Sequence, residues 1–201
     1  MTVKISAKEV GDLRNRTGAG MMDCKKALQE TGGDLEAAVD LLRKKGAAKA
    51  DKRAGRDVKE GVIGSYVHFN GQVGVLVELN CETDFVARTD DFQSLAKEIA
   101  LHVASANPLA VSAEDLPKDI VARERRIIEE TVAESGKPEN VREKMVEGKL
   151  KKFAQEHALL EQMFVKDDKK SIADLVKEVS AKVGENVVVR RFVRYELGGS
   201  A

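Results

Sequence analysis

The sequence predicts an α+β protein in which an N-terminal bundle of three helices precedes a core domain with a small antiparallel three-stranded sheet and further helices. Up to about residue 56, apolar residues recur at helical spacing in three short segments. Beyond Gly61 the apolar period changes to two, and an Asn-Gly dipeptide separates two strand-like segments. Residues 117 to about 160 then form two long amphipathic segments, typical of a projecting helical hairpin. We therefore expect two domains, residues 1–56 and 57–201.

The three N-terminal helices carry recognisable start signals. Ser6 and Glu9 have the spacing of a capping box in front of the first helix. Asp34 is placed to cap the third helix, because its side chain would accept a hydrogen bond from a free backbone N–H. In the second helix, Met22 and Leu28 are candidate core residues.

The stretch from Arg43 to Lys59 is strongly basic and is opposed only by Asp51 and Asp57. We interpret it as a polar linker, partly helical and solvated, that belongs with the N-terminal domain. Contact with the ribosome or with RNA is the alternative, although no aromatic residues are interleaved for base stacking.

The clearest strand pattern follows Gly61. Val62–Phe69 and Gln72–Asn80 are predicted strands, and the second of them places Val73, Val75, Val77 and Leu79 on one face. Asn70-Gly71 between them favours a two-residue hairpin turn. A third strand, Val187–Leu197, is expected to join this hairpin.

Helical patterns occupy most of the remaining core domain. Asp90 or Asp91 is expected to cap the first helix after the strand hairpin. Pro117 is placed to open the first helix of the helical hairpin, because its missing N–H is not needed there. A last amphipathic helix precedes Gly184, which is suited to end it.

The composition excludes several classes of protein. The 201 residues carry 34 basic and 34 acidic side chains, a balance that argues against a protein that coats DNA or an anionic membrane. Cys24 and Cys81 lie far apart in the sequence. They form neither a disulfide framework nor a metal-binding motif. No apolar run approaches the roughly 18 residues of a membrane span. We expect a cytoplasmic protein without a metal or a cofactor.

The segment Asn80–Ala87 is the most informative in the chain. It places a carboxylate, Asp84, and a large ring, Phe85, just beyond a strong apolar strand. Side chains on a stiff support lose little conformational entropy when they dock, and an aromatic anchor can supply much of the energy of an interface. The alternative is local, with Thr83 and Asp84 capping the next helix and Phe85 filling the core.

Two longer motifs stand out, Leu13–Leu28 (LRNRTGAGMMDCKKAL) and Cys81–Val86 (CETDFV). Shorter ones follow at Gly136–Pro138, Lys144–Gly148 and Arg191–Glu196. In this order the motifs resemble those of the elongation factor Ts family, the bacterial and organellar guanine-nucleotide exchange factors for elongation factor Tu. The resemblance extends over nearly the whole chain.

The resemblance implies a protein that binds elongation factor Tu with GDP, displaces its magnesium and promotes GDP release, so that GTP can rebind. It also implies that residues 1–56 form a ubiquitin-associated-like domain that docks on the nucleotide-binding domain of the partner. Arg14, Met21 and Met22 would lie at or near that contact. Bundle packing of the two methionines and a solvated Arg14 are the alternative.

The resemblance further implies that Thr83, Asp84, Phe85 and Val86 enter elongation factor Tu near its magnesium and phosphate site. The exchange factor itself would bind no nucleotide. Movement of the partner's magnesium and phosphate ligands would suffice to loosen the diphosphate.

The single core subdomain is expected to act as a pair. Longer family members carry two related subdomains, with a Thr-Asp-Phe-Val motif in one and a Ser-Tyr-x-His motif in the other. Here Ser65–His68 and Thr83–Val86 occur once each, on one hairpin. We expect a homodimer and a 2:2 complex, in which one partner molecule meets Asp84 and Phe85 of one subunit and His68 of the other. Alternatively, His68 is a plain histidine at the side of the hairpin.

Two other classes of function fit less well. An enzyme is not expected, because the sequence has no nucleophile elbow, phosphate-binding glycine loop or metal-spaced cluster. A generic module that binds helices and dimerises, without exchange activity, would explain the helices. It would not explain why Asp84 and Phe85 stand side by side at a strand end.

Overall fold

The computed structural model describes residues 5–199, with the backbone alone for Ala47, and these residues form two compact units. Unit 1 combines the chain up to residue 61 with segments 80–92 and 176–188. Unit 2 holds segments 62–79 and 93–175 and the chain from residue 189. The division into domains 1–56 and 57–201 stays a prediction, and the outermost residues of both, 1–4 and 200–201, lie outside the described residues.

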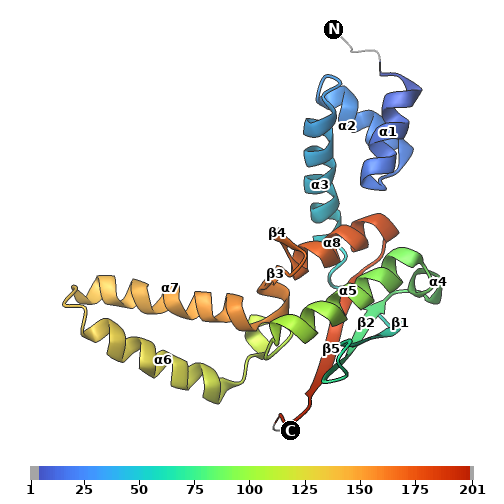
Figure 1. Cartoon of the computed structure of the whole chain (residues 1–201). Helices are drawn as coiled ribbons and strands as arrows, with labels where there is room; N and C mark the ends of the chain where they lie inside the picture. The colour runs from blue at the N-terminus through green and yellow to red at the C-terminus, as the bar shows by residue number, and fades with distance from the viewer. Residues whose placement is uncertain (1–4, 200–201) are drawn as a thin grey trace. The chain divides into compact units, whose positions relative to one another are not determined.

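Three helices open unit 1, namely α1 (Ala7–Thr17), α2 (Met21–Glu30) and α3 (Leu35–Asp51) (Figure 1). Their predicted caps are confirmed. The Ser6 hydroxyl accepts a hydrogen bond from the Glu9 N–H at 3.3 Å, and the Ser6 N–H donates to the Glu9 carboxylate at 2.7 Å. The Asp34 carboxylate accepts from the Ala37 N–H at 3.0 Å. The likeness of this bundle to ubiquitin-associated domains stays a prediction.

The three helices share one core, formed by the buried residues Val10, Leu13, Cys24, Ala27, Leu28, Ala38 and Leu42. Leu28 is confirmed as a core residue. The prediction for Met22 is wrong, because its side chain is 65% exposed. Cys24, two residues on, points into the core, and positions two apart on a helix lie on nearly opposite sides.

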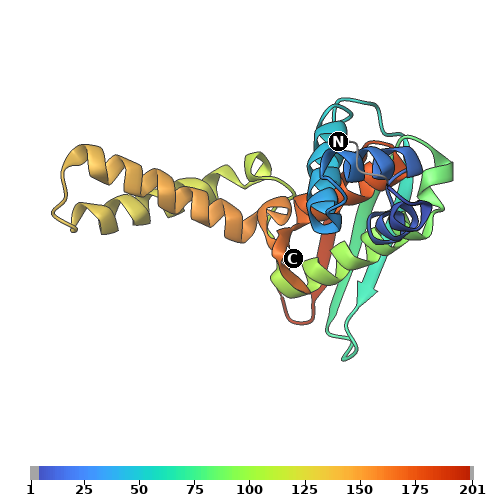
Figure 2. The same cartoon turned by 90° about the horizontal axis from the view of Figure 1, so that it is seen from above.

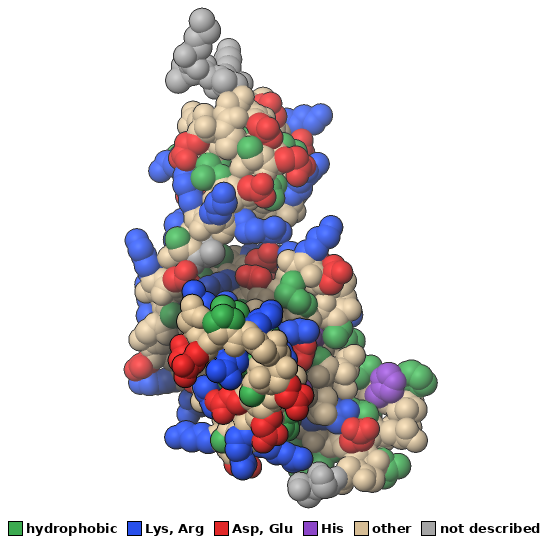
Figure 3. Space-filling model, turned by 90° about the vertical axis from the view of Figure 1, so that its left-hand side faces the viewer, with side chains coloured by type: hydrophobic (Ala, Val, Ile, Leu, Met, Phe, Trp, Pro, Cys, Tyr) green, Lys and Arg blue, Asp and Glu red, His purple; other side chains and the backbone are tan. Residues whose placement is uncertain are grey.

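The basic stretch is helical up to Asp51, and part of its charge is paired. The Lys45 ammonium lies 2.7 Å from the Glu30 carboxylate, and that of Lys49 lies 3.0 Å from the Asp23 carboxylate. Figure 3 likewise shows basic and acidic side chains intermixed on the face that it draws. Exposed pairs stabilise a fold only slightly, but they leave these cations partnered, as expected for a solvated connecting helix.

The main sheet consists of β1 (Glu60–Val67), β2 (Val73–Cys81) and β5 (Val187–Glu196), in the order β1-β2-β5. The His68 N–H donates to the Val73 carbonyl at 2.9 Å and closes the hairpin between β1 and β2. The prediction of a two-residue turn at Asn70-Gly71 is wrong, because the loop spans residues 69–72 and the Gly71 N–H donates to the His68 carbonyl at 2.8 Å. The Leu197 N–H donates to the Gln72 carbonyl at 2.8 Å, which brings the end of β5 to the start of β2. Both neighbours of β2 are therefore antiparallel to it, and the predicted three-stranded sheet is confirmed.

One face of this sheet is covered by α5 (Asp90–Ala106). Val75 and Val77 of β2 are buried on that face. Gly64 of β1 approaches the helix so closely that a Cβ atom there would lie 2.8 Å from both the Cβ and the carbonyl oxygen of Ala96. The glycine therefore sets the distance between strand and helix.

The cap of α5 differs from the prediction. The Thr89 hydroxyl accepts a hydrogen bond from the Phe92 N–H at 3.4 Å. Asp90 and Asp91 instead occupy the first turn of the helix, where their negative charges interact favourably with the positive end of the helix dipole. The prediction passed over Thr89, which is also of a residue type that caps helices.

A helical hairpin projects from the rest of unit 2 and is formed by α6 (Lys118–Ala133) and α7 (Glu139–His157) (Figure 2). Its own small core consists of Ile128, Val132 and Val146. The turn contains Gly136, whose φ of +65° suits a residue without a Cβ atom. The predicted hairpin and the predicted α+β class are confirmed.

A second, two-stranded sheet was not predicted. It consists of β3 (Met163–Phe164) and β4 (Asp167–Ser171), which leads into α8 (Ile172–Val183). Two short 3-10 turns, Ala113–Asp115 and Leu159–Glu161, flank the helical hairpin. A two-residue strand has no detectable apolar period, so pattern analysis could not find it.

Among the described residues, no helix is long and apolar enough to cross a membrane.

His102 is a buried polar residue that ties together three parts of unit 2. Its Nδ1 accepts a hydrogen bond from the Val165 N–H at 3.3 Å, and its Nε2 lies 3.0 Å from the Gln162 side-chain oxygen. The Gln162 amide donates in turn to the Glu156 carbonyl at 2.7 Å. Burial lowers the pKa of His102 below its usual 6.5, and the bond to Gln162 offsets this only in part. The ring is thus neutral and structural.

We predict that Gly64→Ala destabilises the fold by about 1–3 kcal/mol, because the added methyl group meets backbone that has no room to move. Gly74→Ala is the matched control, since nothing lies within 4 Å of a Cβ atom at that strand glycine. Urea unfolding followed by circular dichroism measures both variants. Equal stability of the two would contradict the close approach at Ala96.

We predict that the free energy of unfolding falls as the pH is lowered from about 7.5 to 5.5, partly because of His102. The unfolded chain, with a histidine pKa near 6.5, takes up a proton that the folded chain excludes, so stability is lost below that pH. His102→Asn should flatten this dependence while lowering stability at every pH. An unchanged slope in urea titrations of the variant would contradict the assignment.

Candidate functional site

The motif Thr83–Val86 forms most of a single helical turn, α4 (Asp84–Ala87), between β2 and α5 (Figure 1). Thr83 is its N-cap, and the Thr83 hydroxyl accepts a hydrogen bond from the Val86 N–H at 3.4 Å. Val86 and Ala87 are buried, with exposed fractions of 5% and 6%. The turn therefore has one buried side.

The solvent side carries the two side chains that the sequence singled out. Phe85 is 77% exposed, so the interpretation in which it fills the core is wrong. The Asp84 side chain is also largely exposed, and its carboxylate lies 2.7 Å from the Arg88 guanidinium. A large apolar ring in water is unfavourable for the isolated chain, and an aromatic anchor of this kind can supply much of the energy of an interface.

The residue before the turn is held by a carboxylate from a distant part of the chain. Oε2 of Glu185 accepts hydrogen bonds from the N–H groups of Glu82 and Thr83, at 3.1 and 3.0 Å. Oε1 of Glu185 accepts from the Thr83 hydroxyl at 2.6 Å. All three donors belong to two consecutive residues, so one carboxylate fixes both the backbone and the cap of α4.

A second set of bonds runs beside the first. The Glu82 carboxylate accepts from the Asn186 N–H at 2.7 Å and lies 3.4 Å from the Arg56 guanidinium. The buried Asn186 side chain donates to the Arg56 carbonyl at 3.0 Å and to the Ala54 carbonyl at 3.4 Å. The strand end, the start of β5 and the end of the linker are thus joined through two side chains.

Sequence analysis did not single out Glu185 or Asn186. They lie 102 or more positions beyond their partners, between Gly184, which was expected to end a helix, and the predicted strand Val187–Leu197. Local patterns carry no signal for a contact over such a separation.

Cys81 ends β2 just behind the motif. Its side chain is buried, and the thiol donates a hydrogen bond to the Thr83 carbonyl at 3.2 Å. Burial raises the pKa of the Cys81 thiol to about 11, and the nearby negative charge of Glu185 adds to the rise. The thiol therefore serves as a protonated donor that supports the turn.

The predicted contact residues of the bundle are on its surface. Met21 and Met22 begin α2 and are 45% and 65% exposed, so neither fills the bundle core. Arg14 lies in α1 and is also exposed. Together they present two flexible apolar side chains and one guanidinium to solvent.

His68 belongs to unit 2 and follows β1 at the turn of the strand hairpin. Its Nδ1 lies 3.0 Å from the Tyr66 hydroxyl, and its ring centroid lies 4.4 Å from that of Phe69. Phe69 itself is 92% exposed. The histidine is therefore half-buried in a small aromatic cluster and is not isolated on the strand.

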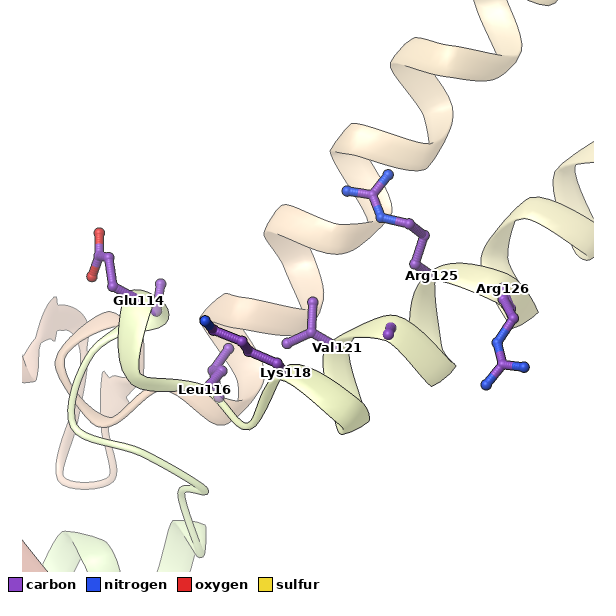
Figure 4. Close-up of a pocket in the computed structure, with 8 residues that line it drawn as sticks. Glu114, Leu116, Lys118, Val121, Arg125 and Arg126 are labelled. Atoms are coloured by element: carbon purple, nitrogen blue, oxygen red, sulfur yellow. The ribbon is translucent and has the colours of Figure 1, made fainter.

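A pocket at the start of α6 contains none of the motif residues. Eight residues line it: Ala113, Glu114, Leu116, Lys118, Val121, Ala122, Arg125 and Arg126. Arg125 and Arg126 point in different directions and do not converge on one point (Figure 4). Within residues 5–199, no group of three or more His, Cys, Asp or Glu side chains is arranged to hold a metal ion. The exposed turn α4 is the better candidate for the functional site.

The comparisons with known proteins agree with the resemblance drawn from the motifs. The protein family described as Elongation factor TS matches residues 49–199. Elongation factor Ts of Syntrophobacter fumaroxidans is 55% identical over 198 residues, which cover 98% of this chain and 99% of the relative. That of Thermosipho melanesiensis is 56% identical over 194 residues, covering 96% and 99%. That of Fervidobacterium nodosum is 55% identical over 196 residues, covering 98% and 100%. The chain therefore belongs to the elongation factor Ts family and is a nucleotide exchange factor for elongation factor Tu, not an enzyme.

Proposed function

We propose that the chain accelerates GDP release from elongation factor Tu by inserting the exposed side of α4 near the magnesium and phosphate site of its partner. The observation that carries the proposal is the 77% exposure of Phe85 on a turn whose other side is buried. An exposed aromatic ring on a fixed support docks with little loss of conformational entropy. Thr83 caps the turn and Val86 is buried beneath it, so both fix its orientation. Asp84 and Phe85 are the side chains that would contact the partner.

The proposed mechanism is one of linkage. If the factor binds the empty partner more tightly than the GDP-loaded partner, the affinity of that partner for GDP falls by the same ratio. Each tenfold increase in this ratio corresponds to about 1.4 kcal/mol of coupling free energy. Displacement of magnesium by the inserted turn would supply the coupling, because it would remove favourable contacts to the diphosphate. Neither magnesium nor nucleotide has to bind to the factor itself, and once GDP has left, GTP can rebind.

Other surfaces would add affinity. Met21, Met22 and Arg14 are exposed together on the first two helices and suit a docking site on the nucleotide-binding domain of the partner. His68, held by Tyr66, would contribute a further contact.

We also propose that two chains pair through the open face of the main sheet, giving a homodimer and a 2:2 complex. While α5 covers one face, the other carries exposed apolar side chains from all three strands: Ile63, Val67, Leu76, Val193 and Tyr195. The Glu78–Arg191 ion pair, at 2.7 Å, adds a polar contact among them. Clustered exposed apolar residues on a sheet face are typical of a protein interface, and a second copy offers a self-complementary partner.

We predict that Phe85→Ala slows factor-dependent release of fluorescent GDP from elongation factor Tu at least about tenfold, the effect expected of an aromatic anchor. Ile127→Ala is the matched control, because it removes an exposed apolar side chain of α6, which lies in unit 2. Asp84→Ala should also slow release, whereas Arg88→Ala, which breaks the same ion pair from the other side, should not. Normal release with Asp84 and Phe85 both replaced would refute α4 as the inserted element.

We predict that the free protein sediments at twice its chain mass of 22.0 kDa. Combined Ile63→Glu and Leu76→Glu should yield monomers, because two buried charges would oppose pairing. Val141→Glu, which places the same charge on an exposed valine of α7, should leave the dimer intact. A single-chain, one-to-one complex with full exchange activity would exclude the homodimer.

A further inference from the structure

The three hydrogen bonds to Glu185 suggest a role beyond packing. Its two oxygens together accept two backbone N–H bonds and one hydroxyl bond, all within 3.1 Å. The Thr83 hydroxyl is used twice, since it donates to Glu185 and accepts from the Val86 N–H. The carboxylate therefore orients the group that caps α4.

Glu185 is itself well anchored. Gly184, with a φ of +80°, ends α8 in a left-handed conformation, and its N–H donates to the Ser180 carbonyl at 3.0 Å. The Ser180 hydroxyl donates to the Glu185 carbonyl at 2.6 Å. The glutamate side chain thus extends from a tight, doubly bonded helix end.

The same helix also holds the far side of the turn. Lys182 of α8 forms an ion pair with Asp91, in the first turn of α5. Glu185 binds the chain before α4, and Lys182 binds the chain after it. Four residues of helix are too few to keep a fixed orientation unaided, so α8 supplies the frame in which Phe85 is presented.

We infer that Glu185 is a positioning residue for nucleotide exchange, which acts by holding Thr83 and the turn α4 in the orientation that docks. The inference rests on the proposed insertion of this turn into elongation factor Tu. Without the carboxylate, two N–H groups and a hydroxyl lose their acceptor, and the turn has to be ordered when the complex forms. Hydrogen bonds to a charged acceptor are stronger than neutral ones, which suits a carboxylate at this position.

The test compares Glu185→Ala, Glu185→Gln and Asp115→Ala in GDP release from elongation factor Tu. Asp115 is the control, because its carboxylate also accepts a bond from a hydroxyl, that of Ser112 at 2.7 Å, and it lies in unit 2. We expect release about three- to tenfold slower with Glu185→Ala, and within about twofold of wild type with Glu185→Gln, whose amide oxygen still accepts both N–H bonds. Asp115→Ala should promote GDP release at the wild-type rate.

A variant with both Glu185→Ala and Phe85→Ala distinguishes a positioning role of Glu185 from a general contribution to the stability of the fold. If Glu185 acts through α4, Glu185→Ala should slow release no further when Phe85→Ala is already present. Backbone amide exchange at Glu82 and Thr83 should be faster in Glu185→Ala than in Glu185→Gln, and this readout needs no partner protein. If Glu185→Ala does not fold, Glu185→Asp replaces it, because the shorter side chain withdraws the carboxylate but keeps the charge.

Wild-type release by Glu185→Ala, together with slow release by Phe85→Ala, would overturn the role of Glu185 and leave the proposed insertion intact. Additive effects of the two changes would overturn it as well, since Glu185 would then act elsewhere. Wild-type release by Phe85→Ala would remove the proposed insertion, and the inference with it.

Discussion

The constraint on which the site depends is the shortness of α4. One helical turn has too few internal hydrogen bonds to be stable alone, so its orientation is imposed by neighbours. Burial of Val86 and Ala87 fixes one side, and the Thr83 cap fixes its start. Exposure of Phe85 is the consequence, because the side of a turn opposite its buried residues has to face water.

This arrangement suits a protein that changes the state of another protein without doing chemistry itself. A ligand shifts an equilibrium only by its difference in affinity for the two states. In the proposed insertion, the surface that creates the difference reaches into the partner and is rigid before it does so. A ring on a short, framed turn meets both conditions, whereas a ring on a free loop would lose part of its binding energy to ordering.

Local features of the fold were predictable from the sequence, and distant contacts were not. Ser6, Glu9 and Asp34 sit within three residues of the N–H groups that they bind, so spacing alone revealed them. The strands Glu60–Val67 and Val73–Cys81 follow from the period of two, whereas the predicted two-residue turn at Asn70-Gly71 is replaced by a longer loop closed between His68 and Val73. Met22 was misassigned because composition favours a buried methionine, while the geometry of the helix turns it outward.

At the candidate site the same limit applies. Thr83, Asp84 and Phe85 were identified because they form a motif next to a strand, but the motif left open whether Phe85 is exposed or fills the core, and only the structure shows it to be exposed. Glu185 was missed, because its partners lie 102 and 103 positions earlier and no local rule connects them. The two-stranded sheet at Met163–Phe164 was missed for the opposite reason, since it is too short to show any pattern.

The hydrogen bond from Cys81 to the Thr83 carbonyl also has a chemical consequence for the strand end. The thiolate, not the thiol, reacts with peroxides, disulfides and alkylating agents. With its pKa raised to about 11, the buried Cys81 is almost entirely in the unreactive form at neutral pH. The segment that carries Phe85 is thereby protected from oxidation at Cys81. Oxidative stress in the cell would not change nucleotide exchange by modifying this cysteine.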